Sequence, residues 1–237
     1  MTGIVLHHHT GLGDHFMCNA IVHHMAKKYG EVDLIVKEHL VKTMCHLYED
    51  QDNIFIVPVV EEFSQSMNYA QHYNKDLHRI GFDKCDFNNF EDSFYTQIGL
   101  DPKEEFDGFI LPTNLENSKK FYTKVVEKLG DDYIFVHDVS SYRSFDLKIK
   151  SSHPRFVVDK NDTDDVLDYI DTICNAKEIH VINSGLSNLV FQLFYKNMIK
   201  TSEVYFHDAR KPEHGGIRIK IPKGIKVAEY ESEMVNA

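Results

Sequence analysis

The richest group of potentially reactive side chains lies in residues 3–29, GIVLHHHTGLGDHFMCNAIVHHMAKKY. It combines three consecutive histidines (residues 7–9), the glycines Gly11 and Gly13, and one carboxylate, Asp14. A carboxylate in a cleft can act as a general base toward a substrate hydroxyl. The same side chain at the start of a helix can simply accept backbone N–H bonds. The residues alone leave both roles open for Asp14.

The elements around this group predict how it is held. Residues 3–6 are apolar and partly β-branched, which indicates a buried strand. The two glycines indicate a turn, and apolar residues then recur at helical spacing until Gly30 ends the run. Strand, glycine turn and helix form the opening unit of a nucleotide-binding α/β domain, although the dinucleotide fingerprint GxGxxG is absent.

A second glycine turn, Asn183 to Asn188 (NSGLSN), follows a predicted strand and opens a predicted helix. Free N–H groups at that helix start, with the hydroxyls of Ser184 and Ser187 and the bare backbone of Gly185, would suit a phosphate. Ordinary helix capping by the serines is the alternative. The position after the penultimate strand favours phosphate.

A third group, Ser140, Ser141 and Arg143, follows the first strand of the second half. A guanidinium can bind phosphate oxygens through two parallel hydrogen bonds. Lys148 is a reserve candidate for the basic residue, and a solvated polar loop is the alternative for the whole group. A weaker fourth group follows the strand at residues 204–207 and consists of Arg210, Lys211, His214, Gly215 and Gly216.

The remaining chain alternates short apolar runs with amphipathic stretches, which predicts parallel sheets with right-handed crossovers. We expect strands at residues 3–6, 32–36, 53–57, 78–82, 133–137, 156–158, 178–182 and 204–207. We expect helices from residue 14 to 29 and at 38–48, 61–73, 90–100, 115–129, 162–175 and 189–195, with a further one possible in the acidic tail. The pattern restarts near residue 133, and Pro112 to Glu116 is the best boundary between two domains.

Composition narrows the class of protein. The chain has 237 residues and a formal net charge of −11, which argues against a surface for nucleic acid. Its four cysteines are scattered without paired spacing, so we expect reduced thiols and a reducing compartment. No signal peptide and no apolar run of about 20 residues is visible, so we expect a cytoplasmic protein without a membrane span.

The GLGD opening resembles that of the heptosyltransferase-like GT-B glycosyltransferases. This resemblance implies an α/β fold of two Rossmann-like domains facing a cleft: residues 1–112 on the acceptor side, with the catalytic base, and residues 113–237 on the nucleotide-sugar donor side. It implies that Asp14 is the base, and that the groups around Arg143 and Ser184 bind the donor diphosphate. The implied reaction moves a sugar to a hydroxyl of a glycan or other acceptor, inverts the anomeric centre, and needs no metal or cofactor.

The histidine run at residues 7–9 also suggests a metal site or a tag. Neighbouring residues on an extended chain point to opposite faces, so the three side chains cannot easily bind one ion. We therefore expect no metal, and expect His8 or His9 to line the cleft with Gly11 and Gly13, bonding the acceptor or orienting Asp14. His23 and His24 lie on a helix and suggest surface or packing roles.

Other functions remain as alternatives. A nucleotide-binding or partner-binding module of the same fold, without catalysis, fits the short chain. The lack of GxGxxG and of a YxxxK pair disfavours an epimerase or NAD enzyme. The lack of GxSxG and GxxxxGK[ST] disfavours a serine hydrolase and a P-loop enzyme.

Overall fold

The computed structural model describes residues 3–140, 143–209 and 219–228. The chain divides into two compact units, with the division between Leu115 and Glu116. The predicted boundary, between residues 112 and 113, lies three residues earlier.

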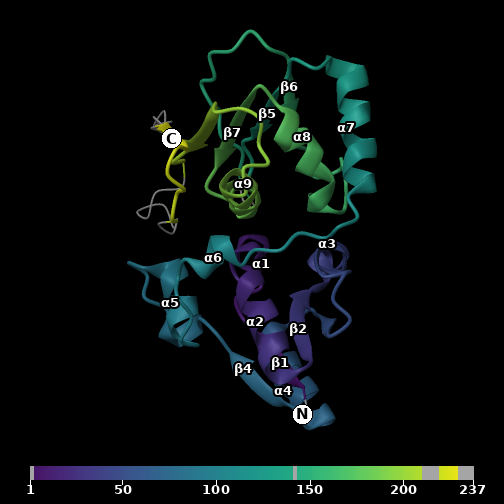
Figure 1. Cartoon of the computed structure of the whole chain (residues 1–237), viewed down its shortest axis with the longest axis vertical. Helices are drawn as coiled ribbons and strands as arrows, with labels where there is room; N and C mark the ends of the chain where they lie inside the picture. Colours follow the sequence, from purple (N-terminus) through teal and green to yellow (C-terminus); the bar gives the residue numbers. More distant parts are fainter. Residues whose placement is uncertain (1–2, 141–142, 210–218, 229–237) are drawn as a thin grey trace, which may run out of the picture. The chain divides into compact units, whose positions relative to one another are not determined.

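The first unit contains a four-stranded parallel sheet with strand order β3-β2-β1-β4 (Figure 1). Its strands are β1 (Ile4–His7), β2 (Val32–Lys37), β3 (Ile54–Val59) and β4 (Asp76–Arg79). The two central strands are buried almost throughout, as expected for parallel strands covered on both faces. Because all strands are parallel, the residues that follow them gather at one edge of this sheet.

The helices of the first unit begin and end mostly near the predicted residues. They are α1 (Leu12–Met17), α2 (Asn19–Tyr29), α3 (Val41–Leu47), α4 (Glu62–Tyr73), α5 (Phe90–Thr96) and α6 (Glu104–Asp107), with 3₁₀ turns at Glu38–Leu40 and Phe82–Lys84. The single helix expected from residue 14 to 29 is wrong. It starts two residues earlier and is divided at Cys18, whose ψ of 4° departs from helical geometry.

Helix α4 has clear end signals. The carboxylate of Glu61, its N-cap, accepts the N–H groups of Phe63 and Ser64 at 3.0 and 2.7 Å. Asn74 ends the helix in the left-handed conformation at φ 51°. On its inner face, Ala70 and Tyr69 pack on a cluster of sheet residues that includes Val57. This fixes α4 against the edge strand β3.

The second unit contains a five-stranded parallel sheet with strand order β6-β5-β7-β8-β9. Its strands are β5 (Ile134–His137), β6 (Arg155–Val157), β7 (Glu178–Ile182), β8 (Val204–His207) and β9 (Lys226–Ala228). Its helices are α7 (Glu116–Leu129), α8 (Ile170–Asn175) and α9 (Gly185–Tyr195), with a 3₁₀ turn at Val166–Tyr169. Strand β9 was not expected from the sequence, and the helix considered for the tail lies outside the described residues.

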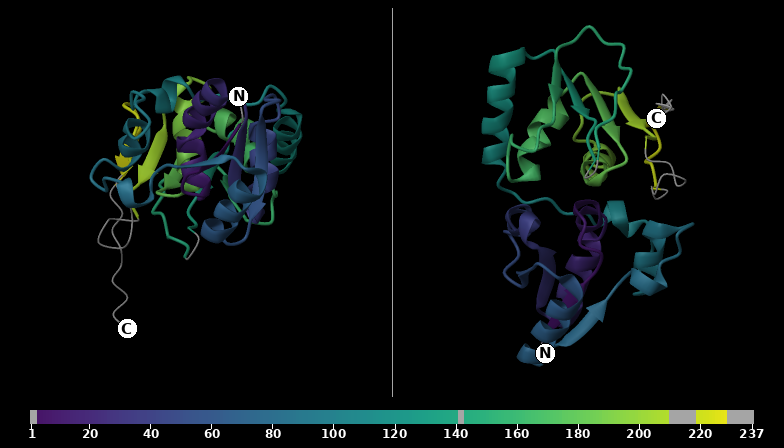
Figure 2. Two further views of the ribbon diagram at one scale, coloured as in Figure 1. Left: turned by 90° about the horizontal axis from the view of Figure 1, so that it is seen from below. Right: turned by 180° about the vertical axis from the view of Figure 1, so that it is seen from behind.

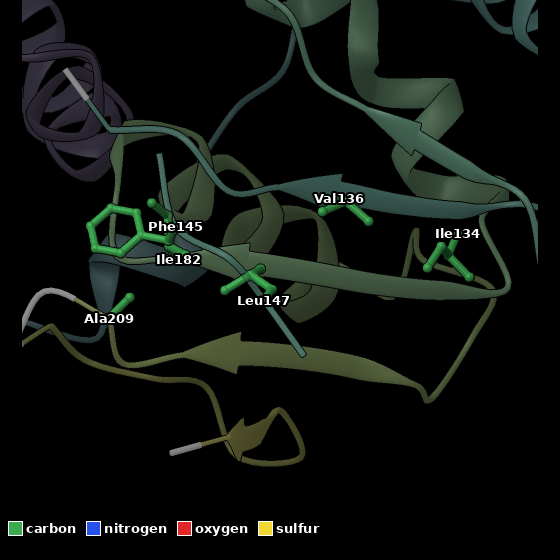
Figure 3. Close-up of a cluster of buried hydrophobic side chains, with 6 residues drawn as sticks. All are labelled: Ile134, Val136, Phe145, Leu147, Ile182 and Ala209. Carbon is green, nitrogen blue, oxygen red and sulfur yellow. The ribbon is translucent and has the colours of Figure 1, made fainter. Parts of the chain in front are cut away.

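One connection of the second unit lacks a helix. Between β5 and β6, residues 143–154 run without helical structure (Figure 2). Phe145 and Leu147 of this segment are buried against Ile134, Val136 and Ile182 of the sheet (Figure 3). An extended segment thus covers sheet surface that a crossover helix usually covers.

The predicted α/β fold with parallel sheets is therefore confirmed. Among the described residues, no helix is both long enough and apolar enough to span a bilayer.

Candidate active site

Asp14 is the third residue of α1, directly beyond the carboxyl end of β1. Its carboxylate accepts hydrogen bonds from the backbone N–H of Gly11, the N-cap residue, and from its own N–H. The side chain therefore caps the helix, as the simpler prediction said. It stays partly exposed, so capping does not remove it from solvent.

Gly11 makes this conformation possible. A Cβ built on Gly11 would lie 2.6 Å from Oδ2 of Asp14, closer than real contacts of a Cβ. Its φ of −72° is open to any residue, so the glycine is needed for space and not for backbone freedom. Gly13 is the second residue of α1 and is partly exposed.

The surroundings of Asp14 set its acidity. Burial raises the pKa of the carboxyl to about 6, against the opposing effect of the two N–H groups and of Lys37. The nearby carboxylate of Glu62 raises the pKa further. A base with a pKa of about 6 is mostly charged at neutral pH and is more basic than an ordinary aspartate.

Glu62, at the start of α4, connects several of these groups. Its Oε2 accepts the hydroxyl of Thr10 and lies 3.9 Å from Nζ of Lys37 and 4.0 Å from Nε2 of His7. The Thr10 contact joins α4 to the loop that precedes Asp14. No local pattern predicts this contact, because 52 residues separate the partners.

The three consecutive histidines have different environments. His8 is fully buried, and burial lowers its pKa to about 4. Its Nδ1 lies 2.6 Å from the carbonyl of His9, which can only accept, so Nδ1 carries the proton. Its ring lies 4.7 Å from that of His15, which is also fully buried and whose pKa burial lowers well below the usual range. These two rings act as packing next to Asp14.

His9 is half-buried and packs its ring against Phe82, Phe90 and Phe94. Its Nε2 accepts the N–H of Phe82 at 2.9 Å. Nδ1 is then the protonated nitrogen. The bond fixes the ring and joins the loop after β1 to the loop after β4.

Arg79 ends β4 at the same edge of the sheet. Its guanidinium lies 4.6 Å from the ring centroid of Phe63 and 4.4 Å from that of Phe82. These cation–π contacts hold an exposed arginine close to the loop that carries Asp14. No sequence motif marks Arg79, because nothing local identifies the end of β4 as a neighbour of β1.

In the second unit, the NSGLSN turn lies between β7 and α9 as predicted. Ser184 is the N-cap of α9, and its hydroxyl lies 3.1 Å from Nδ1 of His137 at the end of β5. Burial lowers the pKa of His137 to about 4, so the imidazole is neutral. Gly185 begins α9 and is partly exposed.

Ser187 has a structural task in the same turn. Its buried hydroxyl donates to the carbonyl of Ser184 at 2.7 Å and accepts the N–H of Ser184 at 3.3 Å. It therefore holds the start of α9 in shape. No local pattern predicts the contact between His137 and Ser184, because it forms only when β5, which ends at His137, lies beside β7, which ends two residues before Ser184.

The third predicted group is partly described. The N–H of Ser140 donates to the carbonyl of Arg143 at 2.9 Å, which holds these two residues close together. The exposed guanidinium of Arg143 lies 4.5 Å from the ring of Phe145. Lys148 pairs with Asp146. Ser141 lies outside the described residues, as does the fourth predicted group: Arg210, Lys211, His214, Gly215 and Gly216.

Within the described part of the chain, no group of three or more His, Cys, Asp or Glu side chains is arranged to hold a metal ion. Each unit thus places predicted polar residues at the carboxyl edge of its parallel sheet. In open α/β sheets this is the edge where ligands bind.

Comparison with solved structures shows the fold. The chain is similar to a family 9 glycosyl transferase from Veillonella parvula, with a TM-score of 0.58 and 10% identity over 98% of this chain and 86% of that one. It is also similar to the bacterial iron-containing dodecameric glycosyltransferase TibC from enterotoxigenic E. coli, with a TM-score of 0.54 and 13% identity, covering 93% of this chain and 61% of that one. No family model and no curated protein sequence matches the chain. The resemblance predicted from the GLGD opening is confirmed at the level of the fold.

Proposed function

We propose that the protein is a glycosyltransferase that moves a sugar from a nucleotide-sugar donor to a hydroxyl of an acceptor. The fold similarity to glycosyltransferases supports transfer of a glycosyl group in general. The observation that carries the proposal for this chain is Asp14: a partly exposed carboxylate, held by two backbone N–H groups, with a pKa raised to about 6.

In the proposed reaction Asp14 removes the proton from the acceptor hydroxyl as its oxygen attacks the anomeric carbon. The bond from that carbon to the donor phosphate oxygen breaks on the opposite side, so the anomeric centre inverts. The electron pair of that bond leaves with the nucleotide diphosphate. The step as written uses no metal and no cofactor.

The second unit would hold the donor. The free N–H groups at the start of α9, near Ser184 and Gly185, suit a diphosphate. Arg143 and Ser140 can add hydrogen bonds from the loop after β5, with Ser141 as a further candidate. These groups would stabilise the charge that grows on the leaving nucleotide. The proposal requires the two units to face one another across a cleft, with the acceptor on the first unit.

The direct test is Asp14→Asn. Removing a general base typically lowers the rate by about 10²–10⁴-fold, while donor affinity should stay within about twofold. The measurements are turnover with a panel of nucleotide sugars and titration calorimetry with the corresponding nucleoside diphosphates. A matched control is Asp76→Asn, because Asp76 is exposed at the opposite end of the same sheet.

Full transfer by the Asp14→Asn protein would refute the base assignment. Tight donor binding without any transfer or donor hydrolysis by the wild type would favour a binding module of the same fold.

A further inference from the structure

The first unit has a groove away from Asp14, between α4 and the edge strand β3. Its volume is about 310 Å³, at the lower end of the range for small-molecule sites. The floor is apolar and comes from Val57, Pro58 and Val59 at the end of β3. The wall comes from α4.

The residues of the wall follow one stripe of the helix. Gln65, Asn68, Tyr69, His72 and Tyr73 have spacings of three and four residues, which places them on one face of α4. With a rise of about 1.5 Å per residue, this stripe is about 12 Å long. A stripe of that length matches an oligomeric ligand better than a single small molecule.

Two tyrosines form the aromatic part of the groove. The rings of Tyr69 and Tyr73 lie 4.6 Å apart, and Tyr73 is 55% exposed. The hydroxyl of Tyr69 is hydrogen-bonded to the buried carboxylate of Asp33, which also binds Nζ of Lys75 at 2.8 Å. Tyr69 is therefore fixed in place, while the ring of Tyr73, which also lies 4.7 Å from the ring of His72, remains more than half exposed.

Besides the tyrosine hydroxyls and the imidazole of His72, the groove has two neutral amides, those of Gln65 and Asn68. The side-chain oxygen of Gln65 accepts the N–H groups of Val60 and Glu61, which leaves its NH₂ group toward solvent. Asn68 is exposed, and no described residue bonds its amide. No Asp, Glu, Lys or Arg is among the described residues that line the groove.

An exposed aromatic ring next to neutral amides over an apolar floor matches one class of ligand. A sugar ring has an apolar C–H face that packs on an aromatic ring, and hydroxyls at its rim that bond to amides in both directions. The lack of full charges disfavours a phosphorylated or acidic ligand. Pro58 lacks an N–H inside β3, which disfavours docking of another chain by strand pairing.

The groove also connects to the proposed reaction site through α4. The helix begins at Glu62, whose carboxylate bonds Thr10 in the loop before Asp14, and the stripe begins one turn later at Gln65. We infer that this groove binds a neutral oligosaccharide, as the part of the acceptor that extends away from the reacting hydroxyl. Only the role of this ligand as an acceptor rests on the proposed function; the binding of an oligosaccharide does not.

The test is binding of neutral hexasaccharides built from glucose, galactose, mannose or N-acetylglucosamine, with the corresponding monosaccharides for comparison. The method is saturation-transfer NMR followed by titration calorimetry on the full chain. We expect at least one hexasaccharide to bind better than its monosaccharide. Tyr73→Ala and Asn68→Ala should each weaken that binding by about tenfold or more, a loss of about 1.4 kcal/mol.

Met67→Ala is the matched control, because Met67 is 59% exposed on the same helix and is not part of the groove lining. It should leave the affinity unchanged. Circular dichroism and thermal melting of all three variants check that α4 is intact. Failure of every hexasaccharide to bind, or binding unaffected by Tyr73→Ala, would overturn the inference. So would a wild-type dimer that Tyr73→Ala dissociates, since the groove would then be an interface between copies.

Asp14→Asn separates this inference from the proposed function. It should keep oligosaccharide binding and lose transfer. Binding that depends on Tyr73 in a protein that consumes no donor would leave the groove standing and remove the transferase proposal. If the wild type transfers sugar and the Tyr73→Ala variant binds oligosaccharides normally, the transferase proposal stands and the groove inference falls.

Discussion

Asp14 holds a charge that the fold does not favour. Its pKa is raised to about 6 by burial, whereas in an unfolded chain it would be near 3.8. Between these values the native state binds more protons than the unfolded state, so Asp14 lowers stability as pH rises through this range. Above pH 6 the ionised carboxylate carries the full penalty.

Asp14→Asn should therefore stabilise the protein at pH 7.5, by about 1–2 kcal/mol, although the same change removes the proposed base. The gain should shrink toward zero near pH 4, where both side chains are neutral. Urea unfolding of wild type and variant at several pH values measures this. The raised pKa would be contradicted if the stability of the variant minus that of the wild type were smaller at pH 7.5 than at pH 4.

Residue-scale chemistry was only partly visible in the sequence. Asp14 could be identified because its neighbours Gly11 and Gly13 mark a turn within three residues. Glu62, Arg79 and His137 could not, because their contacts with Thr10, Phe82 and Ser184 depend on which strands become neighbours. A local pattern carries no information on that pairing.

At the scale of elements, the turn after β4 depends on Gly81. Its φ is +91°, and a Cβ there would lie 2.7 Å from the ring of Phe94 and 3.2 Å from that of His9. Gly30, at the end of α2, has a similar φ of +87° but no atom within 4 Å of a Cβ. Alanine substitutions at the two glycines therefore distinguish the cost of backbone strain from the cost of crowding.

Gly30→Ala should cost about 1–2 kcal/mol through backbone strain alone. Gly81→Ala should cost that amount plus about 1–3 kcal/mol, because the added methyl displaces packed rings. Chemical denaturation measures both. Equal losses at the two positions would show that the rings around His9 yield without cost.

The strands show why some elements were predictable and others were not. Strand β7 was predicted at its observed ends, because Glu178–Ile182 is a compact apolar run buried in the middle of its sheet. Strand β9 has three residues on the outside of the sheet, with Lys226 and Val227 exposed, and so gives no hydrophobic signal. The break at Cys18 was missed because apolar residues continue at helical spacing through it.

At the scale of the whole molecule, buried histidines set the response to acid. Burial lowers the pKa of five of them to about 4: His7, His8, His23, His137 and His207. In the unfolded chain each would titrate near 6.5. Between pH 6.5 and 4 the unfolded state thus binds more protons than the native state, with a sign opposite to that of Asp14.

We expect the free energy of unfolding to fall steeply as pH drops from 6.5 to 4. The slope is about 1.4 kcal/mol per pH unit for each proton taken up. Urea titrations across this range give the number of protons. His8→Gln should remove one proton from the slope, because burial lowers the pKa of His8 to about 4. A free energy that stays constant from pH 6.5 to 4.5 would contradict neutral buried imidazoles.

The helix-free connection after β5 links ligand binding to the stability of the core of the second unit. The guanidinium of Arg143, at one end of this segment, contacts the ring of Phe145. Phe145 belongs to a buried hydrophobic cluster of the second unit. Movement of the Arg143 guanidinium toward a bound anion would therefore be coupled to the packing of the buried Phe145. Donor occupancy and the tightness of that core should rise and fall together, so that amide protons of residues 145–149 exchange more slowly when a nucleoside diphosphate is present.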